Sequence, residues 1–183
     1  MFLREQANKM YGVVPYYLAK ILSELPSFIM PPTLFCLITF FGVGFTRTAD
    51  NFLIYWAMFI CTVIAGVSFG YFISSTVKNP VAAMQLAPVI IMPLMLVGGF
   101  YVNQDSMPMW MKIFSYIAPF KYSFNTFART EFEGSPYPLA ERMLNFLDIQ
   151  TSISECFLYQ IILILCLQTA SVIFLKVLVE KFQ

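Results

Sequence analysis

The stretch NPVAAMQLAPVIIMPLMLVGGFYVN, residues 79–103, contains no charged side chain. A helix rises about 1.5 Å per residue, so about 20 residues cross a hydrocarbon core of about 30 Å. Asn79 followed by Pro80 is a favourable helix start. A bilayer offers no partner for unpaired backbone groups, and the stretch lacks the alternation of a membrane β-strand. It therefore predicts a transmembrane helix over about residues 80–102.

Three more charge-free runs of similar length lie at residues 25–46, 51–77 and 156–175. The sequence thus predicts an all-α, polytopic membrane helical bundle with four transmembrane helices, over about residues 21–46, 51–75, 80–102 and 156–177. Residues 1–14 form a short cytoplasmic amphipathic segment in this prediction, and residues 15–183 form one membrane domain.

The composition agrees with lipid as the solvent. Of 183 residues, 59% are apolar, 17% aromatic and 11% charged, and the mean hydropathy is +0.73. Ordinary soluble domains carry about a quarter charged residues. A net charge of +1 without histidine argues against nucleic-acid binding and against histidine-based catalysis or a metal site.

Positive charges indicate the orientation. The side of the membrane that holds both termini carries six cations. One of them lies in a short connection between two spans, and short loops weigh most in the positive-inside rule. These cations are Arg4, Lys9, Lys20, Lys78, Lys176 and Lys181. Both termini are therefore predicted to be cytoplasmic.

Residues 103–155 are predicted to form an outer segment with a re-entrant helical hairpin. Residues 108–132 are nearly as apolar as a span, but Pro119 interrupts them and three cations punctuate them. A fifth span remains the alternative. Aromatic side chains of this segment are expected at headgroup depth, namely Trp110, Tyr116, Phe120, Tyr122 and Phe127.

Two patterns concern helix contacts. Lys20 and Glu24 are spaced i,i+4 and are expected to form an ion pair where the chain enters lipid. In the second span, small residues recur every fourth position and allow close helix packing, namely Thr62, Gly66, Gly70 and Ser74. We expect this packing within the chain rather than at a subunit interface.

The third predicted span carries a stripe at helical spacing, formed by Met84, Pro88, Met92 and Met95. Thioether side chains repack easily, so the stripe suits a promiscuous apolar binding wall, with ordinary packing as the alternative. The bulky pair Phe100 and Tyr101 follows two glycines. This pair suits a plug in a path or, alternatively, an aromatic interface belt.

No phosphate-binding glycine loop, buried carboxylate pair or catalytic serine arrangement occurs in the chain. It is therefore not expected to be an enzyme on its own. A channel or lipid scramblase is disfavoured, because the spans carry only isolated glutamines such as Gln85 and Gln168.

Three segments resemble the membrane domain of White-type (ABCG subfamily) half-transporters. Residues 79–103 and SMPMWMKIFSYIAPFKYSFNTFARTEFEG at 106–134 are similar to the fifth helix and re-entrant loop of that family. REQANKMYGVVPYYLAKILSELP at 4–26 is similar to its cytoplasmic loop and the start of its third helix. The chain thus resembles family helices three to six of an ABC-2 type membrane domain.

This resemblance implies an ATP-driven exporter of lipids, sterols or amphipathic small molecules that works by alternating access. The implied partners are a nucleotide-binding domain, two preceding helices, a second half-transporter in a homo- or heterodimer, and membrane lipids. ATP and Mg²⁺ would bind that other domain, so this chain needs no cofactor. The plasma membrane is the implied location.

The resemblance also assigns individual roles. Arg4 and Glu5 fall in the segment that couples to the nucleotide-binding domain. Met84, Pro88, Met92 and Met95 correspond to the cavity side of the fifth helix, and Phe100 and Tyr101 to the outer plug. The competing hypothesis is a non-transporting truncated remnant or assembly subunit.

Overall fold

The computed structural model describes residues 12–45, 48–77, 79–102, 107–133 and 151–180, with positions 139, 142–144, 147 and 149 between the last two ranges. Every regular element labelled within these ranges is a helix, which confirms the all-α prediction. The helices are α2 (Val13–Val43), α3 (Ala49–Thr76), α4 (Pro80–Leu96), α5 (Met109–Ile117), α6 (Pro119–Phe132) and α8 (Ile153–Glu180).

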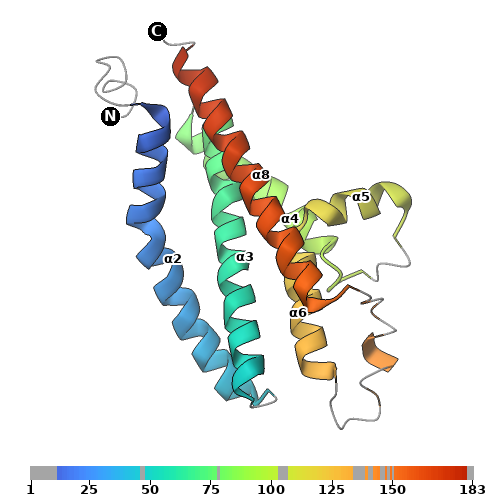
Figure 1. The fold of residues 1–183 in the computed structure, drawn as a ribbon. Helices are drawn as coiled ribbons and strands as arrows, with labels where there is room; N and C mark the ends of the chain where they lie inside the picture. Colours follow the sequence, from blue (N-terminus) through green and yellow to red (C-terminus); the bar gives the residue numbers. More distant parts are fainter. Residues whose placement is uncertain are drawn as a thin grey trace.

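Three helices, α2, α3 and α8, are long and apolar enough to cross a membrane. Helix α3 lies at the centre and contacts α2, α4, α6 and α8. Helix α2 begins and α8 ends at the same end of the bundle (Figure 1). The start of α2 and the end of α8 thus lie on one side of the bundle, in agreement with the prediction that both termini share a side.

The first span starts earlier than expected. Helix α2 begins at Val13 rather than near residue 21, and it includes Pro26, Pro31 and Pro32 without a break. It ends at Val43 because Gly44 adopts a left-handed conformation with φ of 78°, which glycine tolerates without strain.

The predicted span over residues 80–102 is wrong at its far end, because α4 stops at Leu96 after 17 residues. Gly99, with φ of 90°, turns the chain there, a conformation that favours glycine. Helix α4 therefore reaches only part of the way along the bundle, and α6 runs on toward the other end (Figure 1).

The broken hairpin is confirmed. Helix α5 ends at Ile117, Ala118 is extended, and α6 starts at Pro119. The aromatic side chains of the hairpin differ in burial, and their depth in the membrane stays a prediction. Trp110 and Tyr116 of α5 are exposed, whereas Tyr122 of α6 is buried, because α6 packs against both α3 and α8.

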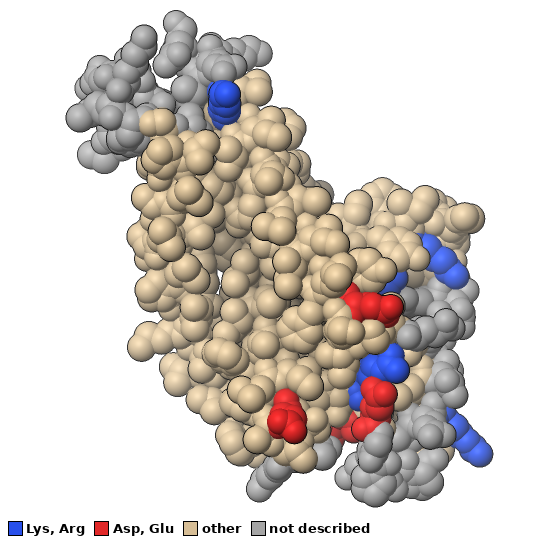
Figure 2. Space-filling model, in the orientation of Figure 1, with Lys and Arg blue, Asp and Glu red and all other residues tan. Residues whose placement is uncertain are grey.

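Two apolar clusters hold these helices together. One joins α3, α4 and the hairpin through Phe69, Leu94, Val97, Met107 and Ala118. The other joins α3, α6 and α8 through Met58, Tyr122 and Cys156. On the face in Figure 2, a basic side chain lies near the upper end, the remaining charged side chains lie in the lower right part, and a broad uncharged surface separates them.

Candidate functional site

The methionine stripe lies on an open face of α4. Met84, Pro88, Met92 and Met95 are all exposed, and the exposed fraction of Met92 is 65%. Leu94 is the one buried residue of this fully described helix. The stripe is therefore available to line a space that another surface completes.

The aromatic pair lies just after α4, where the chain turns. The rings of Phe100 and Tyr101 meet edge to face at 4.8 Å, and Phe100 also meets Phe124 of α6 at 5.8 Å. Both rings remain more than half exposed, at 67% and 56%. The pair is thus anchored on one side to α6 and free on the other.

Gly98 brings the end of α4 against the start of α6. A Cβ added to Gly98 would lie 2.9 Å from the Cβ of Phe120 and 3.1 Å from the carbonyl oxygen of Met95. Real Cβ atoms essentially never approach another atom to 2.9 Å, and 3.1 Å is a tight contact. The position of the aromatic pair therefore depends on a residue without a side chain.

The hairpin is held closed by a buried cation. Lys121 is 8% exposed, its Nζ donates to Ser115 Oγ at 3.2 Å, and it lies 4.2 Å from the centre of the Tyr116 ring. The Tyr122 hydroxyl donates to the Tyr116 carbonyl at 2.7 Å and adds a second bond across the hairpin.

The small-residue ladder of α3 meets α6 at Thr62. Thr62 Oγ1 and Ser123 Oγ of α6 share a hydrogen bond at 2.5 Å. A Cβ added to Gly66 or Gly70 would meet nothing within 4 Å, and Ser74 is exposed. No described helix lies over the two glycines, so their part in close helix packing stays a prediction.

The ion pair predicted between Lys20 and Glu24 is not found among the described residues, because both side chains contact Tyr71 of α3 instead. Glu24 accepts a hydrogen bond from the Tyr71 hydroxyl of α3, and Lys20 Nζ lies 5.2 Å from the centre of the Tyr71 ring. Both charged side chains thus connect α2 to α3. Arg4 and Glu5, the predicted coupling residues, lie outside the described residues.

The sequence reasoning missed a polar seam along α8. Gln168 accepts from the Tyr17 hydroxyl of α2 and donates to Ser68 Oγ of α3 at 2.8 Å. Gln160 is fully buried, and its amide nitrogen and oxygen find no partner among the described residues. The sequence contained a signal for this seam, because Gln160 and Gln168 are eight residues apart and residues with that spacing share a helix face.

Comparisons with known proteins agree with this architecture. The family described as ABC-2 type transporter matches residues 1–132. Relatives include Protein white of Ceratitis capitata, 35% identical over 67% of this chain and 18% of the relative, and Protein white of Drosophila melanogaster, 33% identical over the same shares. ABC transporter ATP-binding protein/permease wht-1 of Caenorhabditis elegans is 30% identical over 72% of this chain and 20% of the relative. The chain thus spans about a fifth of the length of these relatives.

Proposed function

This chain belongs to the ABC-2 type transporter family, and from that premise we propose that it forms the membrane part of an ATP-driven exporter. The proposed cargo is a lipid, a sterol or another amphipathic small molecule. A nucleotide-binding domain, which would hold ATP and Mg²⁺, and two further helices would complete one half-transporter.

The exposed stripe on α4 carries this proposal. Four uncharged side chains, Met84, Pro88, Met92 and Met95, share one face that the described part of the chain leaves open. Flexible thioethers adapt to ligands of different shape. A second half-transporter, identical or related, would close the stripe into a cavity.

The aromatic pair supports a gate at the end of that cavity. Phe100 follows α4 directly and is braced by Phe124, while most of its ring remains exposed. A bulky ring that is held on one side only can pack against a partner ring and separate again. Phe100 and Tyr101 are therefore the proposed outer plug.

Alternating access is the proposed mechanism. Nucleotide binding would move the segment with Arg4 and Glu5, narrow the cavity along α4 and open the plug outward. The cargo would then leave, because the two states differ in affinity for it. Both termini would be cytoplasmic, and the plasma membrane is the proposed location.

Phe100→Ala in the complete transporter tests this proposal. Removing the ring should leave the plug leaky, so less cargo is exported per ATP hydrolysed. The measurement is export of a fluorescent amphipath from vesicles together with the rate of ATP hydrolysis in the same preparation.

Phe41→Ala is the matched control, because Phe41 of α2 is exposed to a similar extent and lies on another helix. Its ratio of export to hydrolysis should match that of the wild type. An unchanged ratio in Phe100→Ala contradicts the plug. The absence of export and of cargo-stimulated hydrolysis in the wild type would favour a non-transporting membrane protein.

A further inference from the structure

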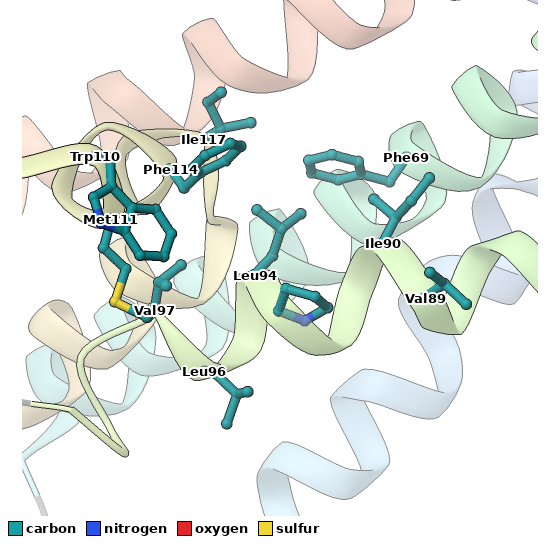
Figure 3. A pocket seen from close by; sticks show the side chains of 11 residues that line it. Phe69, Val89, Ile90, Leu94, Leu96, Val97, Trp110, Met111, Phe114 and Ile117 are labelled. Carbon is teal, nitrogen blue, oxygen red and sulfur yellow. The ribbon is translucent and has the colours of Figure 1, made fainter.

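We propose that the cavity between α3, α4 and α5 binds one acyl chain of a membrane lipid, at a site separate from the methionine stripe. The cavity measures about 540 Å³. Figure 3 shows side chains of α4 and α5 on its walls and Phe69 of α3 beside them. The lining residues are Phe69, Val89, Ile90, Pro93, Leu94, Leu96, Val97, Trp110, Met111, Phe114 and Ile117.

The cavity and the stripe lie on different faces of α4. At about 100° per residue, the five lining residues of α4 and Val97 just after it are centred roughly 160° from the centre of the stripe. The cavity is bounded on its other sides by the hairpin and by α3. A ligand there would not occupy the space that the stripe faces.

The walls are preformed. Leu94 and Val97 are buried, and they pack with Phe69 of α3 and Ala118 of the hairpin in one cluster. The contact of Gly98 with Phe120 fixes the end of α4 against α6. Small-molecule sites are usually preformed cavities of about 300–1,000 Å³, so this one has room for a single chain.

The chemistry of the walls favours a hydrocarbon chain. The indole nitrogen of Trp110 is the one side-chain polar atom among the lining residues, all of which the structure describes. A sterol hydroxyl or a headgroup would lose its water there without a matching set of partners, which is costly. An acyl chain has no polar atom along its length and incurs no such cost.

The mouth of the cavity opens toward the lipid that surrounds the transmembrane helices. Trp110, Phe114 and Ile117 of α5 are at once lining residues and exposed. Exposed apolar side chains on a helix that packs against a transmembrane bundle contact lipid tails. A membrane lipid is the most abundant molecule at the mouth of the cavity, and it is therefore the proposed occupant.

The site should select lipids by their acyl chain and not by their headgroup. Lys112 is exposed, but it lies on α5 roughly 170° from the centre of the residues that line the cavity. No cation belongs to the lining, all of which the structure describes. Zwitterionic and anionic lipids with the same chains should therefore bind equally.

Photolabelling of the protein in phosphatidylcholine vesicles tests the site. A trace of phosphatidylcholine with a diazirine in the middle of one chain is irradiated, and labelled peptides are identified by mass spectrometry. Label should concentrate on the lining residues of α4 and α5. Ile90→Trp should lower that label about tenfold by filling the cavity.

Val81→Trp is the matched control, because it adds the same ring at an exposed position on the opposite face of α4 and should leave the label unchanged. Val89→Trp is a second filling variant, useful if Ile90→Trp does not fold. Circular dichroism and gel filtration check folding. The test needs neither ATP nor transport, so its result is independent of the proposed export.

Several outcomes overturn the proposal. Label spread evenly over α2, α4 and α8 means ordinary lipid contact, and an unlabelled wild type means that a second copy or another helix covers the cavity. Competition by a photoreactive sterol, with stronger label at the same residues, assigns the site to sterols. A marked preference for phosphatidylserine over phosphatidylcholine contradicts selection of the lipid by its acyl chain alone.

Discussion

Helices α4 and α6 are near neighbours in the chain, yet the apolar helix is exposed and the polar helix is buried. A soluble protein shows the reverse. Helix α4 is uncharged, and Leu94 is its one buried residue. Helix α6 contains Lys121, Arg129 and Glu131, and seven of its 14 residues are buried. The apolar helix faces outward and the polar helix faces inward.

The difference teaches what each helix contacts. Apolar side chains on α4 need no protein cover if lipid surrounds them, so burial gains little there. Polar groups on α6 need partners in a medium without water, and several of them find one, although Asn125 Oδ1 has none among the described residues. Ser123 bonds Thr62, and Asn125 Nδ2 donates to Thr151 Oγ1 at 3.1 Å.

The largest expected effect comes from forcing the two helices apart. Gly98→Val should lower the free energy of unfolding by about 3 kcal/mol, because the new side chain collides with Phe120 and with backbone. The melting temperature in detergent measures it. Gly66→Ala is the control, since it enters open space and replaces glycine within a helix, so stability should hold or rise slightly. Equal losses in both variants would refute the close contact.

A second test removes the charge that closes the hairpin. Lys121→Met should cost about 2 kcal/mol, because a charged hydrogen bond to Ser115 and the contact with the Tyr116 ring are lost. Lys112→Met, at an exposed lysine of α5, should change little. Thermal unfolding of both variants, side by side, measures the difference. A loss confined to Lys112→Met would place the stabilising charge on α5 instead.

The smallest expected effect has the opposite sign. Gln160→Met should leave stability unchanged or raise it by up to about 1 kcal/mol, because a buried amide without partners gives way to an apolar side chain of similar volume. Gln168→Met should instead destabilise, since Gln168 bonds both Tyr17 and Ser68. A clear loss of stability in Gln160→Met would reveal a partner for that amide outside the described residues.

The sequence predicted the features that depend on local chemistry. Long uncharged runs identified α2, α3 and α8, and Pro119 identified the break in the hairpin. The resemblance to White-type half-transporters agrees with the family match. Each of these features can be inferred from one segment without knowledge of its neighbours.

The remaining features depend on contacts between distant segments. The end of α4 at Leu96 follows from the turn at Gly99 and the fit of Gly98 against Phe120. The burial of Tyr122 follows from the position of α6 between α3 and α8. The stripe and plug assignments stay predictions, since their roles require cargo and a partner.

The short length of α4 has a consequence for the surrounding bilayer. Its 17 residues extend about 26 Å, whereas the 28 residues of α3 extend about 42 Å. The longer helix matches a bilayer including its headgroups, and the shorter one falls below a hydrocarbon core of about 30 Å. Hydrophobic mismatch therefore differs around the bundle, and the bilayer would thin beside α4 but not beside α3. The two leaflets would be deformed on one flank only.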